Sequence, residues 1–181
     1  MTKEKTDRDK LVGKLWKYGV KIEGEGIIGE ILDRGYGEKI GKALFLKPYE
    51  VMYLVDMDKL KIYDEKGDEI GREDLVLQLK RWDKKGWTKY LIYRDLRSKG
   101  YVVKEGFGGG LDFRVYARGE YGKKPAKYLI ISLNEGGQMR VKFLKKLVDK
   151  AIYMGKEPIL AVVDRRGEVV YYRAFKMGLS F

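Results

Sequence analysis

The sequence contains no cysteine and no histidine among its 181 residues. Without cysteine, the chain can form neither disulfides nor thiolate metal sites, which is compatible with a reducing cytoplasm. Without histidine, it lacks the commonest metal ligand and the commonest general acid or base. Any chemistry must therefore use tyrosine, lysine, aspartate or glutamate.

Long apolar segments are also missing. No stretch of about 18 consecutive apolar residues occurs, so no transmembrane helix is expected. The first ten residues, MTKEKTDRDK, lack the apolar core of a signal peptide. We therefore expect a flexible tail over residues 1–9, followed by a folded cytoplasmic protein with no membrane partner. A content of 44% hydrophobic and 36% charged residues is typical of such a protein.

Positive charge is in clear excess. The chain carries 39 Lys and Arg against 27 Asp and Glu, a formal net charge of +12. An excess of this size favours a polyanionic partner such as nucleic acid. Composition leaves open the alternative of a basic surface that is merely solvated.

The hydrophobic pattern predicts two domains, with a boundary in residues 84–86. The first, residues 10–83, is expected to be an α+β domain. Its predicted elements are an antiparallel pair within residues 11–22, a helix that ends in a glycine turn at residues 35–37, strands at 44–46 and 60–63, and helices that begin at Pro48 and Glu73.

The second domain, residues 86–181, shows a clearer pattern of helix, three strands, helix and two strands. The helices are expected at residues 87–100 and 138–154, and the strands at 101–105, 112–118, 127–132, 159–164 and 168–175. GFGGG, residues 106–110, is expected to be a flexible connection. The continuously apolar run at 159–164 is typical of a strand covered on both faces. We predict a mixed sheet with a helix on each face.

The strand at residues 112–118 carries the first candidate site. Alternation directs Phe113, Val115 and Ala117 toward the core and places Asp112, Arg114, Tyr116 and Arg118 together on the opposite face. Tyr116 would then have an arginine on either side, and positive charge favours a phenolate. Such a group is suited to act as a base or to bind phosphate, and simple packing of the tyrosine between two arginines is the alternative.

Two further residues bear on the chemistry. Lys156 stands between the predicted helix and the apolar strand, where its charge suits a phosphorane-like anion or the negative end of the helix dipole. Asp112 raises a metal-dependent nuclease as a possibility. The next strand, KYLIIS, offers no second acid, which argues against a two-carboxylate metal site. We therefore expect neither a metal nor another cofactor.

Several of these segments resemble the archaeal-type tRNA splicing endonuclease family. They are GYVVKEG, GGLDFRVYARG and GKEPILAVVDRRGEVVYYRAF in the second half, and LFLKPYEVMYLV and LKIYDEKGDEI in the first. The Gly-x-Asp-Phe-Arg-x-Tyr segment, together with a lysine just before an apolar strand, is the most specific part. The resemblance implies an α+β N-terminal domain followed by an α/β, restriction-endonuclease-like C-terminal domain with a mixed sheet.

The resemblance also implies a reaction. Family members cleave precursor tRNA at a bulge-helix-bulge without metal, a lyase-type reaction in which the 2′-hydroxyl attacks the phosphate and leaves 2′,3′-cyclic phosphate and 5′-hydroxyl ends. The family's tyrosine base matches Tyr116, and its charge-stabilising lysine matches Lys156. Its histidine acid, in the pattern His-x-x-Tyr-Leu-Val, falls on Pro125, or on Ala126 with a one-residue shift. A basic residue that grips the bulge in the family is replaced by Asp149.

Because the acid is missing, we expect this chain to be the structural subunit of an α2β2 heterotetramer whose catalytic partner carries the complete triad. The resemblance implies subunit-interface roles for Glu135, Val170 and Tyr172, and we expect Arg114 and Arg118 to bind RNA. Two alternatives stay open: an active-site variant of a catalytic subunit, and a stand-alone basic RNA-binding protein on an inactive nuclease fold.

Overall fold

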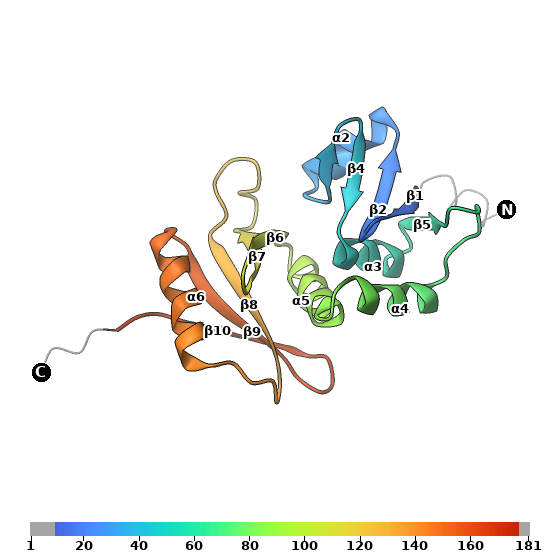
Figure 1. Ribbon diagram of the computed structural model, residues 1–181. Coiled ribbons are helices and arrows are strands. Elements are labelled where there is room, and N and C mark those ends of the chain that lie inside the picture. The colour runs from blue at the N-terminus through green and yellow to red at the C-terminus, as the bar shows by residue number, and fades with distance from the viewer. Residues whose placement is uncertain (1–9, 178–181) are drawn as a thin grey trace, which may run out of the picture. The chain divides into compact units, whose positions relative to one another are not determined.

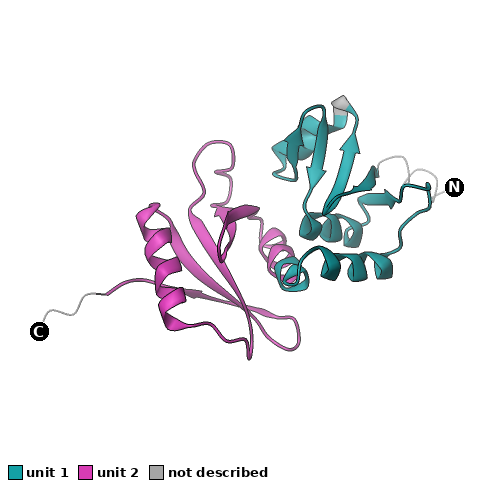
Figure 2. Cartoon of the chain, in the orientation of Figure 1, with its two compact units in different colours: residues 1–90 teal, residues 91–181 magenta. Residues whose placement is uncertain are grey.

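The computed structural model describes residues 10–177, apart from the side chains of residues 25 and 26. The chain forms two units, residues 1–90 (unit 1) and residues 91–181 (unit 2), which divide within helix α5 (Gly86–Ser98) (Figure 2). Each unit contains one five-stranded sheet with helices. The predicted two-domain architecture is confirmed, and the expected tail at residues 1–9 lies outside the described residues.

Unit 1 has the strand order β3-β4-β2-β1-β5 (Figure 1). β1 runs antiparallel to β2, as predicted, and parallel to β5. Its strands are β1 (Leu11–Trp16), β2 (Gly19–Glu23), β3 (Glu38–Ile40), β4 (Ala43–Leu46) and β5 (Leu60–Tyr63), and its helices are α2 (Glu25–Asp33), α3 (Pro48–Asp56) and α4 (Arg72–Trp82). The glycine turn after α2 and the start of α3 at Pro48 are both confirmed.

The two faces of the unit 1 sheet differ. In β1, Gly13 is buried, whereas Val12 and Lys14 on the opposite face are exposed. Helices α2 and α3 pack on the sheet. They cover the face that bears Leu11, because Leu11 lines one pocket together with side chains of both helices. The face that bears Lys14 has neither helix over it.

A buried carboxylate ties α3 to the chain before it. Glu50 is 2% exposed. Its Oε1 accepts a hydrogen bond from the Gly37 backbone N–H at 2.9 Å, and its Oε2 accepts one from the Lys47 N–H at 2.9 Å. Both N–H groups therefore have a charged partner, and Pro48 at the first helical position has no N–H to satisfy.

Unit 2 has the strand order β10-β9-β8-β7-β6. β8 and β9 are parallel and the other neighbours are antiparallel, so the predicted mixed sheet is confirmed. Its strands are β6 (Val102–Gly108), β7 (Leu111–Tyr116), β8 (Tyr128–Asn134), β9 (Glu157–Val163) and β10 (Val169–Arg173), and helix α6 (Val141–Tyr153) connects β8 to β9. No helix between residues 10 and 177 is long and apolar enough to cross a membrane.

Helices lie on both faces of the unit 2 sheet, as the sequence predicted. α6 packs against Leu129 and Ile131. On the other face, the ring of Tyr93 in α5 lies 6.3 Å from that of Phe113, centroid to centroid. Phe113 pairs with Ile130, which alternates with the two residues under α6. The sheet is thus the central layer of the unit.

The expectation that GFGGG forms a flexible connection is wrong for most of this segment. β6 continues to Gly108, with a register shift after Glu105, and only residues 109–110 form the turn. A Cβ atom at Gly106 would lie 2.0 Å from the Leu111 carbonyl oxygen. Glycine is required there because the two strands approach closely, and not because the chain needs flexibility.

The expectation that the apolar strand is covered on both faces is half right. In β9, Ala161 and Val163 are buried, whereas Leu160 and Val162 on the opposite face are only partly buried. The continuous apolar run therefore overstates the burial of β9.

Tyr171 links β10 to α5, and its ionisation gives a prediction about pH. Its hydroxyl donates to Asp95 at 2.7 Å. Burial, followed by this hydrogen bond, raises the pKa of Tyr171 above its ordinary value of 10.0. Because the folded state favours the neutral phenol, this contribution to the free energy of unfolding is complete below about pH 10 and is lost as the pH rises further.

Replacing Tyr171 with Phe tests this link. At pH 8 we expect Tyr171→Phe to lower the free energy of unfolding by about 1–2 kcal/mol. Urea titrations between about pH 8 and pH 11 should then show a smaller alkaline decline in stability for the variant than for the unmodified chain. Equal alkaline declines in the two proteins would contradict the role given to this phenol.

Candidate functional site

Three strands of unit 2 meet at one edge of the sheet. β7 ends at Tyr116, while β8 and β9 begin at Tyr128 and Glu157. Val115 pairs with Tyr128, which in turn pairs with Glu157. Tyr116 and Lys156 therefore both lie one residue beyond this row of paired residues, at the same edge. The two residues that the sequence singled out for chemistry are brought to one place.

Lys127 lies between them. Its backbone N–H donates to the Val115 carbonyl, and its carbonyl accepts from the Glu157 N–H, both at 2.9 Å. Neighbouring strands are about 4.8 Å apart, so the backbones of Tyr116 and Lys156 are separated by roughly 10 Å. That distance can be spanned by two long side chains. We call Tyr116, Lys127 and Lys156 the edge row.

The alternation of side chains along the strands places the edge-row positions on the face of the sheet that α6 covers. Arg114 pairs with Leu129, which packs under α6. Tyr116 is two residues further along the same strand and therefore shares this face. Its ring makes an edge contact with Tyr121, with centroids 4.9 Å apart and an interplanar angle of 86°.

The end of α6 fixes the position of Lys156. Gly155 adopts a φ of 66°. The Lys156 N–H donates to the Ala151 carbonyl, and the Gly155 N–H donates to the Ile152 carbonyl, both at 2.9 Å. These are the two hydrogen bonds of a Schellman motif. The partly buried lysine forms no ion pair with any other residue from 10 to 177, and it is close to the negative end of the helix dipole.

Arg114 shares the face of Tyr116, as predicted. Its guanidinium carbon lies 5.8 Å from the Phe107 ring centroid. Its Nε is buried and has no hydrogen-bond partner in the described part of the chain. An unpaired buried donor is uncommon in proteins. The Arg114 guanidinium thus lies on the Tyr116 face with its Nε–H buried and without a partner among the described residues.

The predicted position of Arg118 beside Tyr116 is wrong. β7 ends at Tyr116, and the chain turns toward Gly119, which has a φ of 73°. Arg118 instead places its guanidinium carbon 4.9 Å from the Tyr101 ring centroid. Ala117 is likewise beyond the strand and only partly buried. The alternation rule fails here because the strand is shorter than its sequence pattern, and an RNA-binding role for Arg118 stays a prediction.

The position expected for an acid lies in the loop between β7 and β8. Pro125 is exposed, whereas Ala126 is 7% exposed. A hydrogen bond with the Tyr128 side chain, followed by the Glu157 carboxylate, raises the pKa of Lys127. The ammonium of Lys127 lies 3.6 Å from that carboxylate. The edge row thus contains a phenol and two ammonium groups, of which that of Lys127 is paired with Glu157, and no imidazole.

Sequence reasoning missed Lys127 and Tyr121 as neighbours of Tyr116. The pairing of β7 with β8 is the feature that places Lys127 opposite Tyr116, and an alternating pattern does not specify which residues pair. Tyr121 lies in an irregular loop, where no periodic signal exists. Both residues belong to the surroundings of the edge row.

Asp149 lies on α6 and carries negative charge where the family resemblance implies a basic residue. Its carboxylate lies 2.6 Å from the Lys145 ammonium and 3.7 Å from that of Lys176. The hydrogen bond and charge of Lys145, with a smaller contribution from Lys176, lower the pKa of Asp149. This position therefore lacks the positive charge that would hold an RNA phosphate.

The residues expected at subunit interfaces lie on exposed parts of unit 2. Glu135 is exposed, and its Oε2 accepts a hydrogen bond from the Arg165 N–H at 3.2 Å. Val170 and Tyr172 are 47% and 55% exposed. They lie on β10, which is an edge strand, as predicted. Tyr171 between them points to the opposite face, where it reaches α5.

The carboxylates do not form a metal site among residues 10–177. No group of three or more Asp or Glu residues is suitably arranged there. Asp112 instead has a structural contact, because its Oδ2 accepts a hydrogen bond from the Ser132 backbone N–H at 3.0 Å. That contact crosses from β7 to β8 at the other end of these strands from the edge row.

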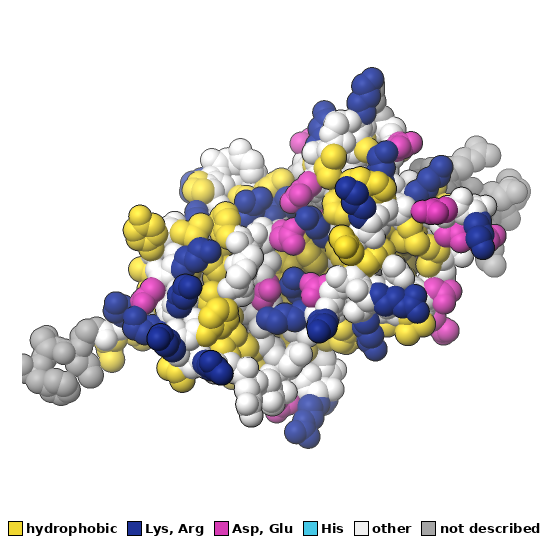
Figure 3. All heavy atoms as spheres, viewed as in Figure 1, with side chains coloured by type: hydrophobic (Ala, Val, Ile, Leu, Met, Phe, Trp, Pro, Cys, Tyr) yellow, Lys and Arg dark blue, Asp and Glu magenta, His cyan; other side chains and the backbone are white. Residues whose placement is uncertain are grey.

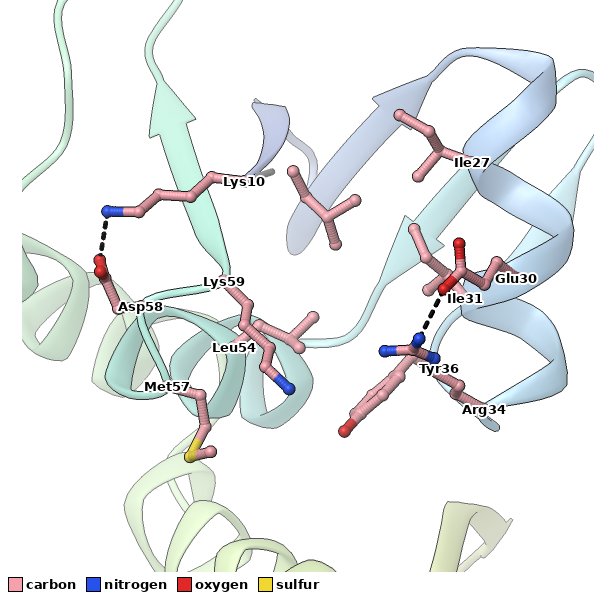
Figure 4. A pocket seen from close by; sticks show the side chains of 11 residues that line it. Lys10, Ile27, Glu30, Ile31, Arg34, Tyr36, Leu54, Met57, Asp58 and Lys59 are labelled. Atoms are coloured by element: carbon pink, nitrogen blue, oxygen red, sulfur yellow. Dashed lines mark hydrogen bonds and ion pairs between the residues drawn. The ribbon is translucent and has the colours of Figure 1, made fainter. Parts of the chain in front are cut away.

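Unit 1 contains a separate pocket of about 590 Å³ (Figure 4). Its apolar lining includes Ile31 and Leu54, and several charged groups surround it. Two of these are paired within the pocket wall: Lys10 with Asp58, and Arg34 with Glu30. The pocket includes none of the edge-row residues, and pairing reduces the charge that it can offer a ligand.

Comparison with known proteins identifies the family of this chain. A family model described as the tRNA intron endonuclease catalytic C-terminal domain matches residues 86–171, and one described as the N-terminal domain matches residues 13–76. The tRNA-splicing endonuclease of Methanococcus vannielii is 35% identical over 145 residues, which cover 80% of this chain and 82% of that protein. The chain belongs to the tRNA intron endonuclease family.

Other archaeal family members are similarly related. The tRNA-splicing endonuclease of Pyrococcus furiosus is 35% identical over 85% of this chain and 89% of that protein. The tRNA-splicing endonuclease of Thermococcus onnurineus is 35% identical over 83% of this chain and 87% of that protein. The family resemblance recognised in the sequence is confirmed. The edge row lies within the match to the catalytic domain of the tRNA intron endonuclease family.

Proposed function

We propose that this chain is a subunit of a tRNA intron endonuclease and that it requires a histidine-bearing family member for efficient cleavage of precursor tRNA. One observation carries the proposal. Tyr116 and Lys156 lie at the same sheet edge, on either side of Lys127, while Pro125 stands at the matched position of the acid in a chain without histidine.

The chemistry assigned to the edge row follows from these groups. Tyr116 accepts the proton of the attacking 2′-hydroxyl, and Lys156 stabilises the negative charge that develops on the phosphate. The 2′-oxygen forms a bond to phosphorus, and the bond to the 5′-oxygen breaks. Without an acid near Pro125, that oxygen leaves as an unprotonated alkoxide, which slows cleavage by about 10²- to 10⁴-fold.

The same proposal gives the chain a structural role in an α2β2 assembly. β10 has an unpaired edge, and Val170 and Tyr172 on its outer face are exposed. Edge strands of this kind pair or pack with partner chains. Glu135 lies in an exposed loop and is the acidic residue available for a contact with an opposing subunit. These features support a role in assembly beside a catalytic partner.

Cleavage assays in EDTA test the proposal. A bulge-helix-bulge RNA is incubated with this chain alone, with a family subunit that carries the complete triad, and with both. We expect the chain alone to be at least about 10²-fold slower than the mixture, and the products to carry 2′,3′-cyclic phosphate and 5′-hydroxyl ends. The reaction with the catalytic subunit alone is the control. It shows how much of the cleavage activity of the mixture depends on the addition of this chain.

Other outcomes would change the conclusion. Rapid cleavage by this chain alone would mean that another group replaces the missing acid. A mixture no more active than the catalytic subunit alone, with no complex detectable by gel filtration, would exclude the structural role. Tight RNA binding by an isolated monomer would then support the RNA-binding alternative.

A further inference from the structure

The uncovered face of the unit 1 sheet carries one continuous row of paired residues. Lys14 in β1 pairs with Tyr63 in β5 and with Lys21 in β2, and Lys21 pairs with Phe45 in β4. Phe45 pairs with Glu38 in β3, so the row crosses all five strands. Paired residues share a face. Two adjacent lysines therefore lie in the middle of this face, with an aromatic ring on either side.

The charge of the two central lysines is only partly compensated. Like charges directly opposite each other on neighbouring strands are destabilising. Glu23 lies 2.7 Å from Lys21, and the Lys21 hydrogen bond and charge, with a contribution from Lys14, lower the pKa of Glu23. Lys14 is exposed and forms no ion pair with any side chain that the structure describes. One glutamate thus faces two ammonium groups.

The turn between β1 and β2 extends this basic and aromatic surface. The Trp16 and Phe45 rings meet edge to face, with centroids 5.4 Å apart. The Lys17 ammonium lies 4.5 Å from the Trp16 ring centroid. Tyr18 is 71% exposed. Lys17 has a φ of 50°, a backbone conformation that glycine adopts more readily, yet the position carries a charged side chain.

We propose that this surface, the open face of unit 1, binds RNA. We define it by Lys14, Trp16, Lys17, Tyr18, Lys21, Phe45 and Tyr63. Phosphates would neutralise the adjacent lysines, and the exposed ring of Tyr18 and the partly exposed rings of Trp16 and Tyr63 provide contacts for unpaired bases, whereas Phe45 is buried. Figure 3 shows basic, acidic and hydrophobic side chains intermixed over the visible surface of unit 1.

The charge of the open face is complementary to that of RNA, which favours RNA as the ligand of this surface. Five lysines lie on or beside the open face, against three glutamates: Lys14, Lys17, Lys21, Lys47 and Lys61, against Glu23, Glu38 and Glu69, which pairs with Tyr63. A nucleic-acid backbone supplies regularly spaced negative charges, and its bases supply flat apolar surfaces. The open face contains no edge-row residue, so it is a second RNA contact beyond the proposed cleavage site.

The test measures the affinity of the full chain for a precursor tRNA transcript by fluorescence anisotropy at several salt concentrations. The variant is Lys14→Gln combined with Lys21→Gln. We expect its affinity at low salt to fall by roughly tenfold, and the slope of log affinity against log salt to decrease by about 1–2. The fold should tolerate the change, because it removes two like charges that lie directly opposite each other.

A matched double variant controls for total charge. Lys80→Gln combined with Lys84→Gln removes the same charge from unit 1. Lys80 belongs to α4, which packs on α3, and α3 covers the other face of the sheet. We expect this control to bind precursor tRNA within about twofold of the unmodified chain, because the removed charges contact no phosphate.

Two results would overturn the inference. One is an equal loss of RNA affinity in both double variants, which would assign the effect to net charge alone. The other is unchanged RNA binding by the Lys14 and Lys21 variant, accompanied by loss of a protein subunit from the assembly, which would make the open face a protein interface. RNA binding is measured in this test without cleavage. Either result therefore leaves the proposal that the edge row cleaves RNA unaffected, and the cleavage assay tests that proposal separately.

Discussion

Replacing Pro125 with His is expected to raise metal-free cleavage of a bulge-helix-bulge RNA by this chain by about 10²- to 10⁴-fold. The chain retains Tyr116 and Lys156 at one sheet edge, so the variant supplies the group that the matched family pattern requires. Pro125 is exposed in the loop before β8, which leaves space for an imidazole. Single-turnover cleavage of end-labelled RNA in EDTA measures the gain.

Two further variants show whether the gain depends on the edge row. Tyr116→Phe in the Pro125→His background should abolish it, because the base is removed while the ring is kept. Ala126→His should give no comparable gain, because Ala126 is 7% exposed and the larger side chain has no space there. If Pro125→His folds and binds the RNA but cleaves no faster, the edge row is not a cleavage site that lacks only its acid.

Replacing Glu50 with Ala is expected to lower the free energy of unfolding by about 3 kcal/mol. The carboxylate accepts hydrogen bonds from two backbone N–H groups, those of Gly37 and Lys47. Removing it leaves these donors without their charged partner in a buried place, because Glu50 is 2% exposed. Urea unfolding monitored by circular dichroism provides the measurement.

Glu65→Ala is the matched control for this prediction. Glu65 is exposed in the turn after β5, so its removal should change stability by less than about 0.5 kcal/mol. Glu50→Gln should fall between the two, because the amide oxygen can replace only one of the two acceptors. A loss for Glu50→Ala no greater than that for Glu65→Ala would show that the buried carboxylate does not hold α3 in place.

Much of the fold was predictable because its determinants are local. Pro48 marks the start of α3, and Gly35 has a φ of 79° in the turn after α2. The alternation of Phe113 and Val115 placed both in the core, where they are buried. The predictions failed where distant segments decide the outcome. GFGGG continues a strand because β7 accommodates it, and Arg118 leaves the Tyr116 face because β7 ends early.

The candidate site was predictable in its residues but not in its arrangement. Tyr116 and Lys156 were recognisable from sequence motifs. Lys127 between them, and the hydrogen bonds that hold it there, follow from the pairing of β7, β8 and β9. The row across the open face of unit 1 likewise joins residues from five strands. No local pattern reports which strands pair.

The sequence by itself determined which chemistry is available to this protein. It has no histidine and no cysteine, it has a large positive charge, and it carries Tyr116 and Lys156 within the segment that matches the family's catalytic domain. The tertiary structure alone decided which of these groups meet. Composition and periodicity are properties of short stretches of chain, whereas strand order, strand pairing and the point where a strand ends depend on contacts between residues far apart in the sequence.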